Sequence, residues 1–364
     1  MKRYLIVKTS SLGDIVQSFP ALSLLKKLEP DSEIDWVAEK NAKELLLNHP
    51  HIKRVIIFEG KKWKKHPWRS HCRKRISYFI KELRLYRYDA IFDLQGNIKS
   101  GVITAFAKSK YKIGFDSQNV AEWPNIIATN RHILVNPTVN LRLQYCQIIN
   151  GFFSSFNKNK KEPDLFLSIN TDKKIEELIS NTLTQKNVNI LVCPFSRWKN
   201  KQVPTNRLYE LLSFLKNDLD ANFLFVSGND NEKIAAQTLA LRFPDRSIVL
   251  SGYSLISLFH LMQRMDLVIS MDSLPLHLSG LSVAPTISFF GPSNSHLYSP
   301  LGDQHLSFQG RCPYGHFFQK RCKHLRSCIS GACMDDFSLD QIAVKLKNWS
   351  FYKDLKNKNI IKQI

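Results

Sequence analysis

The sequence lacks any long apolar run and contains little cysteine. No stretch approaches the roughly eighteen consecutive apolar residues of a membrane-spanning helix. Residues 1–14 have too short an apolar core, and no small-residue cleavage site, for a signal peptide. The 7 cysteines among 364 residues are too few and too scattered for a disulfide framework. We therefore expect a cytosolic protein with reduced thiols.

Acidic residues are also scarce relative to basic ones. The chain has 52 Lys and Arg against 31 Asp and Glu, which gives a formal net charge of +21. This excess predicts an anionic partner, which is nucleic acid, an anionic membrane face or a phosphorylated substrate. The sequence contains no P-loop, no G-x-G-x-x-G fingerprint and no carboxylate cluster with metal-ligand spacing. Charge alone does not choose among the three partners.

The chain does contain a βαβ pattern, which occurs twice. Short runs rich in Val, Ile and Phe alternate with amphipathic stretches, as is typical of a parallel sheet. The expected strands are residues 3–9, 33–39, 53–58, 88–95, 111–115, 189–195, 221–228, 247–252, 266–272 and 284–291. The expected helices start near Asp14, Asn41, Arg69 and Ser100 and cover 138–153, 205–217, 231–243, 254–265 and 275–281. Helical spacing predicts a buried face formed by Leu208, Leu211, Leu212 and Leu215.

A polar, Pro-containing stretch at 157–164 separates the two halves and is predicted to be a linker. The predicted domains are residues 1–160 and 161–335, followed by a helical segment, 336–364, that could pack back across the first domain. Open α/β sheets bind ligands at the carboxyl ends of their strands. Functional side chains are therefore expected directly after the strands.

The loop after the first strand reads SSLGD and ends in a carboxylate, Asp14. Gly13 permits a tight turn or the close approach of a ligand, and Asp14 would stand in the first helical turn beside it. Ser10, Ser11 and Asp14 have a second interpretation, because such residues commonly cap helices. Spacing by itself favours capping over a functional site.

Two loops of the second half are suited to phosphate. Ser196 and Lys201 follow the strand at 189–195, where a hydroxyl and an ammonium suit a diphosphate, although a solvated basic loop is the alternative. The strand at 266–272 leads directly into a helix whose start attracts phosphate. Asp272 is expected to cap that helix while Ser273 and the backbone donate hydrogen bonds.

Three further residues of the second half follow strands or lie on the same helix. His277 either contacts a phosphate or fills a helix interface. Glu232 could hold a ribose diol and Tyr253 could flank a base, or both could belong to turns and caps.

In the first half the tract 59–75 is densely basic and carries Trp63 and Trp68. Basic residues interleaved with aromatic ones suit single-stranded nucleic acid or a lipid interface, and a solvated face is the third interpretation. Another basic residue, Lys99, follows the strand at 88–95. No nucleic-acid-reading motif accompanies the charge, so nucleic-acid binding ranks lowest among the functions considered.

Four segments together resemble a known family. VKTSSLGDIVQSFPAL, YDAIFDLQGNIKS, MDSLPLHLSGL and SFFGPS, in this order and at these separations, resemble the ADP-heptose:lipopolysaccharide heptosyltransferases of glycosyltransferase family 9. The resemblance runs from the first strand to about residue 300 and is closest to the heptosyltransferase I type. It implies an α/β protein with the GT-B fold, in which two Rossmann-like domains with parallel sheets face each other across a cleft. The N-terminal domain would bind the acceptor and the C-terminal domain the nucleotide sugar.

The resemblance also implies roles for particular residues. Asp14 would be the general base of an inverting transfer, and Lys201 would stabilise the departing diphosphate without a metal. The implied nucleotide-sugar site comprises Ser196, Lys201, Glu232, Tyr253, Asp272, Ser273, Leu274 and His277. The implied acceptor site comprises Ser10, Ser11, Gly13, Lys62, Lys64 and Lys99. Two positions depart from the family pattern: Leu274 stands where Gly is common, and Ala121 where relatives tend to carry Arg.

The segment 311–334 resembles a cysteine-containing stretch of some other family members. Its residues Cys312, Cys322, Cys328 and Cys333, with His316 and His324, could bind zinc. Because no C-x-x-C pair occurs, free thiols or an adventitious disulfide are the default interpretation. We expect no metal and no cofactor.

The resemblance implies transfer of a heptose from ADP-heptose to the inner core of lipopolysaccharide, on a 3-deoxy-octulosonate (Kdo) or heptose residue of a lipid A core. The implied location is the inner face of the cytoplasmic membrane, where a basic surface would dock to anionic lipid. No nucleic-acid partner is expected. Another nucleotide sugar or another acidic glycan acceptor remains the alternative within enzymes, and a basic nucleic-acid-binding protein is the alternative outside them.

Overall fold

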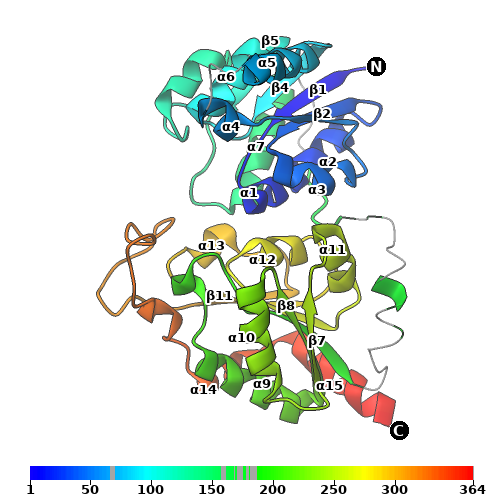
Figure 1. The fold of residues 1–364 in the computed structure, drawn as a ribbon, viewed down its shortest axis with the longest axis vertical. Coiled ribbons are helices and arrows are strands. Elements are labelled where there is room, and N and C mark those ends of the chain that lie inside the picture. Colours follow the sequence, from blue (N-terminus) through cyan, green and yellow to red (C-terminus); the bar gives the residue numbers. More distant parts are fainter. Residues whose placement is uncertain are drawn as a thin grey trace. The chain divides into compact units, whose positions relative to one another are not determined.

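The chain folds into two compact units, Met1–Ile169 and Asn170–Ile364, each built on a six-stranded sheet (Figure 1). The structure is a computed structural model that describes residues 1–65, 70–156, 161–167, 169, 175–177, 180 and 187–363. Within these residues no helix has both the length and the apolar character that crossing a membrane requires. The predicted helix start at Arg69 and part of the predicted linker lie outside the described residues.

The first unit holds six parallel strands in the order β3-β2-β1-β4-β5-β6. They are β1 (Arg3–Val7), β2 (Glu33–Ala38), β3 (Arg54–Ile57), β4 (Arg87–Asp93), β5 (Lys108–Phe115) and β6 (Arg131–Ile133). The helices are α1 (Leu12–Gln17), α2 (Phe19–Leu28), α3 (Lys43–Leu47), α4 (Gly60–Lys65), α5 (Ser70–Leu83), α6 (Ile98–Phe106) and α7 (Leu141–Ser154). Two short 3-10 helices, η1 (Lys40–Ala42) and η2 (Trp123–Ala128), complete it.

The second unit repeats this architecture with the order β12-β11-β10-β7-β8-β9. Its strands are β7 (Val188–Cys193), β8 (Ala221–Ser227), β9 (Ser247–Ser251), β10 (Leu267–Met271), β11 (Thr286–Phe290) and β12 (His305–Gln309). Its helices are α9 (Thr205–Leu219), α10 (Asp230–Ala240), α11 (Leu255–Gln263), α12 (Leu274–Ser279), α13 (Ser295–Tyr298), α14 (Leu339–Asn348) and α15 (Ser350–Gln363). The 3-10 helices are η3 (Lys199–Lys201) and η4 (Ala332–Met334).

Both faces of the first sheet are covered, which explains why its central strands β1 and β2 are buried without alternation. Leu5 and Ile91 belong to a buried cluster with Phe79 of α5 on one face. On the other face the Tyr4 ring lies 6.1 Å from that of Phe153 in α7. Each strand therefore needs apolar side chains in both directions, and short apolar runs were the correct signal.

All the predicted strands are present, and the predicted α/β class with two parallel sheets is confirmed. The prediction missed β6 and β12, which lie at the sheet edges and read RHI and HLSFQ. Edge strands bury less surface than central ones, so their sequences need fewer Val and Ile residues. The leucines predicted to be core on α9 are buried, as are Cys72, Cys146 and Cys193.

The sequence analysis predicted a domain boundary after residue 160. The first compact unit extends further, to Ile169. Asp164 accepts a hydrogen bond from Ser23 Oγ at 3.1 Å and pairs with Lys27 at 2.6 Å. Residues 161–167 are thus attached to α2 of the first unit and extend it.

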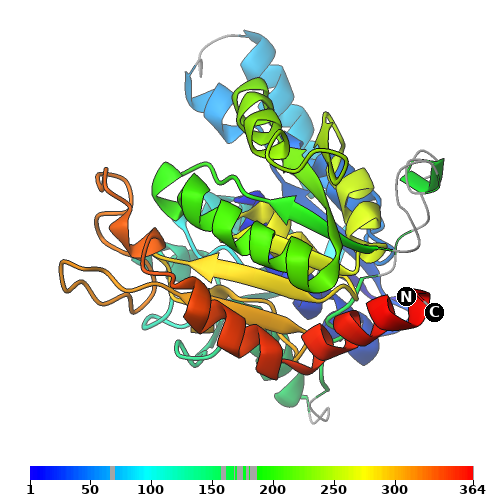
Figure 2. The same cartoon turned by 90° about the horizontal axis from the view of Figure 1, so that it is seen from below.

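The C-terminal helices pack on the second unit. Tyr352 OH and Lys356 Nζ of α15 both donate to the Asp218 carboxylate of α9, each at 2.7 Å. Figure 2 shows α14 and α15 following one another past α9. Packing across the first domain, which the sequence analysis named as a possibility, stays a prediction. Leu346, Tyr352 and Leu355 join the same buried core as the sheet of the second unit, so burial decides the docking site.

The buried face of α9 predicts a large stability effect. Leu212 is fully buried, so Leu212→Ala should lower the free energy of unfolding by about 2–5 kcal/mol, measured by urea denaturation. The matched control is Leu241→Ala, because Leu241 is 81% exposed and its truncation leaves no cavity. Equal urea midpoints for the two variants would contradict the packing of α9.

Candidate active site

Parallel pairing determines where the loops of each sheet lie. Since all strands of a sheet point the same way, the loops after them meet at one edge. In the first unit the strand order reverses between β1 and β4, and in the second between β7 and β10. These reversals are the positions at which open α/β sheets bind ligands. Asp14 and Lys99 follow the first pair of strands, and Lys201 and Asp272 follow the second.

Asp14 stands in the first turn of α1 and is half-buried. Its Oδ2 accepts hydrogen bonds from the Ser11 backbone amide at 3.1 Å and from Ser11 Oγ at 2.8 Å. The capping interpretation is therefore correct. Gly13 lies inside α1 rather than in a turn before it. The two hydrogen bonds from Ser11 also fix the orientation of the Asp14 carboxylate at this edge of the sheet.

Lys99 connects two loops at the same edge. Its Nζ donates to Ser10 Oγ at 3.3 Å and to Glu39 Oε1 at 3.0 Å. The Lys99 ammonium also lies 5.9 Å from the centre of the Phe58 ring. The sequence analysis did not select Glu39, although its position at the end of a predicted strand was an available signal.

A fully buried carboxylate, Asp93, organises the loop that carries Lys99. Asp93 accepts hydrogen bonds from the Gly96 backbone amide at 2.9 Å and from Asn125 Nδ2 at 2.7 Å. Burial raises the pKa of Asp93, and these donors oppose that effect. No feature of the sequence signals this role, because Asp93 lies inside the predicted strand 88–95 like any other strand residue.

The neighbouring Gln95 links this loop to the one after β1. Gln95 Oε1 accepts the backbone amides of Thr9 at 3.2 Å and Ser10 at 3.3 Å. The loops holding Asp14 and Lys99 are therefore fixed to each other by the Gln95 side chain as well as by Lys99 itself.

The remaining predicted acceptor residues lie on α4. The exposed Lys62 pairs with Glu59 at 2.8 Å, and the hydrogen bond from Lys62 lowers the pKa of Glu59. Lys64 belongs to α4, but its side chain lies outside the described residues. The structure thus brings Asp14, Ser10, Ser11 and Lys99 together, whereas Lys62 pairs locally after β3.

In the second unit a buried ion pair joins the loops after β7 and β10. Lys201 Nζ and Ser293 Oγ both donate short hydrogen bonds to Asp272 Oδ2. His277 Nε2 lies 3.7 Å from Asp272 Oδ1. All four residues are buried. Burial by itself raises the pKa of Asp272, but the charges of Lys201 and His277 and the two donors hold this pKa below its ordinary value.

This arrangement corrects the predicted role of Asp272. The N-cap of α12 is Ser273, and the Asp272 carboxylate turns to Lys201 instead of capping the helix. The positively charged Lys201 ammonium forms a stronger hydrogen bond with a buried carboxylate than a neutral backbone amide does. His277 packs in the interior next to this pair. The sequence analysis did not select Ser293 as a site residue, although it ends the segment SFFGPS and follows β11 by three residues.

The Ser273 hydroxyl, at the start of α12 on this edge, has no partner within the described residues. Its Oγ is buried and makes no hydrogen bond there. A buried hydroxyl normally finds a partner in the protein, in water or in a ligand. Leu274, the next residue, is half-buried.

The other predicted nucleotide residues lie in the loops of the adjacent strands. Ser196 is half-buried after β7, and its carbonyl accepts from Gln202 Nε2 at 2.7 Å. Glu232 lies after β8, where its Oε2 accepts the Gly228 amide at 2.8 Å. Tyr253 lies after β9 and is 39% exposed. The edge therefore carries the Ser273 hydroxyl after β10 and the Lys201 ammonium after β7. The Glu232 carboxylate after β8 and the Tyr253 ring after β9 come next.

The sequence matches one protein family over most of its length. The model of glycosyltransferase family 9 (heptosyltransferase) matches residues 76–326. Lipopolysaccharide heptosyltransferase 1 of Campylobacter coli is 28% identical over 299 residues, which are 80% of this chain and 84% of that protein. The protein of the same name from Escherichia coli K12 is 32% identical over 120 residues, which are 33% of this chain and 38% of that protein.

Solved structures share the fold. Escherichia coli heptosyltransferase WaaC with ADP has a TM-score of 0.75 at 21% identity and covers 96% of this chain and 100% of that chain. Escherichia coli ADP-heptose lipopolysaccharide heptosyltransferase II has a TM-score of 0.66 at 16% identity, over 95% and 100%. The family match spans more than half of the sequence and shows that the chain belongs to glycosyltransferase family 9, the heptosyltransferases.

Proposed function

We propose that this protein transfers a heptose from ADP-heptose to a Kdo or heptose residue of the lipopolysaccharide inner core. The observation that carries the proposal is the unpartnered Ser273 hydroxyl next to the buried Lys201–Asp272 pair, at the strand-order reversal of the second sheet. Membership of the heptosyltransferase family supports it. A solved WaaC complex with ADP-2-deoxy-2-fluoro heptose, 24% identical with a TM-score of 0.71, has the same fold over 85% of this chain and 93% of that chain.

The second unit supplies the donor site in this proposal. The diphosphate contacts Ser273, Ser196 and the ammonium of Lys201, which has three N–H donors and uses one on Asp272. Because Asp272 is neutralised by Lys201 and bound by Ser293, it does not face the phosphates as a lone negative charge. Glu232 and Tyr253, one and two strands beyond β7 along the edge, meet the ribose and the base.

The first unit supplies the general base. The Asp14 carboxylate, held through Oδ2 by Ser11, takes the proton of the acceptor hydroxyl as that oxygen attacks the anomeric carbon. The bond from this carbon to the diphosphate breaks on the opposite face, so the configuration inverts and ADP leaves. Lys99, oriented by Glu39, attracts the acidic acceptor sugar. Positioning of this kind requires only an ionised carboxylate within hydrogen-bond reach.

The excess positive charge attracts the protein to the anionic membrane in which the lipid-linked acceptor lies. A net charge of +21 attracts an anionic bilayer face, at about 1 kcal/mol for each well-placed Lys or Arg. We propose that the protein works at the inner face of the cytoplasmic membrane without spanning it.

Replacing the base tests the first unit. Asp14→Asn should reduce kcat for heptose transfer by about 100-fold or more while leaving the Kd for ADP unchanged, because the amide cannot accept the proton. Transfer is measured with ADP-heptose and a defined truncated core acceptor. Asp31→Asn, in an exposed turn, is the matched control and should keep full activity. Normal turnover by Asp14→Asn would overturn the assignment of the base.

Replacing the lysine tests the second unit. Lys201→Met should raise the Kd for ADP by about tenfold or more, since a charged hydrogen bond to phosphate is lost. Isothermal titration calorimetry measures this, and Lys199→Met, at an exposed position two residues away, is the control.

The same titration decides the nucleotide. The unmodified protein should bind ADP more tightly than UDP, GDP or CMP. Tighter binding of UDP would contradict an ADP-heptose donor and favour a different nucleotide sugar.

The buried pair also predicts a pH dependence of stability. Because the pKa of Asp272 is lower in the folded chain than its ordinary 3.8, the ionised pair stabilises the folded state above about pH 4. This contribution is lost as the pH falls through the folded-state pKa. The gap in urea midpoint between the unmodified protein and Asp272→Asn should therefore narrow below about pH 3.8. A gap that is constant from pH 7 to pH 3 would contradict the shifted pKa.

A further inference from the structure

A long segment of the second unit has almost no apolar core of its own. Residues 310–331 connect β12 to η4 without a helix or a strand. Tyr314, Phe317 and Ile329 are 66%, 87% and 100% exposed, and Phe318 is the buried aromatic residue of the segment. Segments that bury so little apolar surface usually need a disulfide or a metal to hold one conformation.

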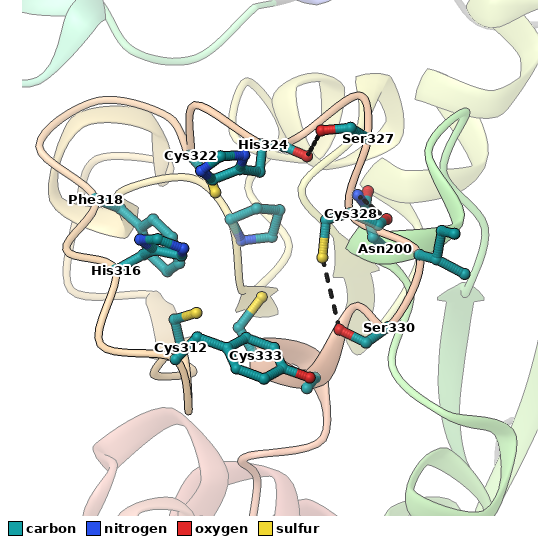
Figure 3. Close-up of a pocket in the computed structure, with 14 residues that line it drawn as sticks. Asn200, Cys312, His316, Phe318, Cys322, His324, Ser327, Cys328, Ser330 and Cys333 are labelled. Carbon is teal, nitrogen blue, oxygen red and sulfur yellow. Dashed lines mark hydrogen bonds between the residues drawn. The ribbon is translucent and has the colours of Figure 1, made fainter.

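Residues 310–334, which add η4 to this connection and which we call the cysteine segment, contain four cysteines that gather around one cavity. Cys312, Cys322, Cys328 and Cys333 line a pocket of about 290 Å³, and His316 and His324 line it too. Figure 3 shows the four sulfur atoms directed into the pocket from different sides. None of the four forms a disulfide, and the other three cysteines of the chain lie in α5, α7 and β7. The spacing had given no C-x-x-C pair, yet the loop brings all four thiols together.

The Cys328 Sγ lies 3.6 Å from Ser330 Oγ, and both residues line this pocket. Four thiolates in one pocket repel each other unless a cation lies between them. Thiolates are the ligands that Zn²⁺ takes in four-coordinate structural sites.

The charge of the segment suits such a centre. One Zn²⁺ with four thiolates carries a net charge of −2. Residues 310–334 contain no Asp or Glu, and their basic residues are Arg311, Lys320, Arg321, Lys323 and Arg326. Neighbouring cations favour the thiolate form of cysteine and offset the negative centre.

The segment is also bonded to the turns that position the buried ion pair. Asn200 Nδ2, next to Lys201, donates to the carbonyls of Leu325 at 2.7 Å and Cys328 at 3.1 Å. The Cys322 amide donates to the Pro292 carbonyl at 2.6 Å, next to Ser293. Both donors to Asp272 are therefore supported by the cysteine segment.

We propose that one Zn²⁺ ion binds to the four thiolates of this pocket and thereby fixes the turns that carry Lys201 and Ser293. The ligands are Cys312, Cys322, Cys328 and Cys333. As the side chains stand, no three Cys, His, Asp or Glu groups of the described residues are close enough to hold an ion. Binding therefore draws the thiols inward across the pocket and releases their four protons. The effect on Lys201 rests on the proposed function, whereas zinc binding does not.

Zinc content tests the site directly. Full-length protein purified without chelator should contain about one Zn²⁺ per chain by inductively coupled plasma mass spectrometry. After chelation, Co²⁺ should give the intense visible bands of tetrahedral thiolate ligation, a readout that needs no variant. Cys322→Ser and Cys328→Ser should each abolish these bands, and Cys146→Ala, at a buried cysteine of the first unit, should keep them.

Two results would overturn the site. One is a chain that takes up neither Zn²⁺ nor Co²⁺ above the level of a Cys322→Ser/Cys328→Ser double variant. The other is a disulfide among the four cysteines in protein alkylated under non-reducing conditions and identified by mass spectrometry.

Calorimetry with ADP tests the effect on the donor site. Removing zinc should raise the Kd for ADP by about tenfold, a change of ~1.4 kcal/mol, and adding zinc back should restore it. An unchanged Kd would overturn the support of Lys201 by the ion and leave zinc binding standing. Failure of the zinc-loaded protein to bind ADP at all would instead overturn the proposed function.

Discussion

Parallel strand pairing places the side chains that we assign to the donor site and to the general base. In each unit, helices connect strands that all run in the same direction. The loops that follow the strands therefore lie along one edge of the sheet. The strand order reverses at β1 and β4 and again at β7 and β10, the positions at which open sheets bind ligands. A lysine and a carboxylate stand beside each reversal, Lys99 with Asp14 in one unit and Lys201 with Asp272 in the other.

The two lysines differ in environment. Lys99 is partly exposed and paired with Glu39 at 3.0 Å, and a pair of this kind contributes about 0–1 kcal/mol. Lys201 and Asp272 are buried, and removing one partner of a buried pair typically costs about 3–5 kcal/mol because the other charge remains. The weak Lys99–Glu39 pair suits a site in which one acceptor molecule must be released and the next one bound. The second suits a preorganised donor site, whose ammonium already has its orientation before the diphosphate arrives.

The cysteine segment connects stability to that donor site. Its few buried apolar groups leave its conformation to hydrogen bonds with Asn200 and Pro292, on the turns next to Lys201 and Ser293. A metal ion among its thiols would act as a small core for residues that lack one. The same ion would then determine how rigidly Asp272 and its partners are held.

By itself the sequence determined the repeated βαβ order, the class of fold and the position of useful residues after strands, because these depend on local periodicity. It also determined the family, through segments such as SSLGD and MDSLPLHLSGL. Only the tertiary structure decided that Asp272 pairs with Lys201, 71 positions away, instead of capping α12, and that Asp93 is a buried anchor. It likewise decided where the C-terminal helices dock and that four irregularly spaced cysteines share a pocket. Contacts between residues far apart in the chain depend on how strands pair and helices cover them, and local spacing carries no record of that choice.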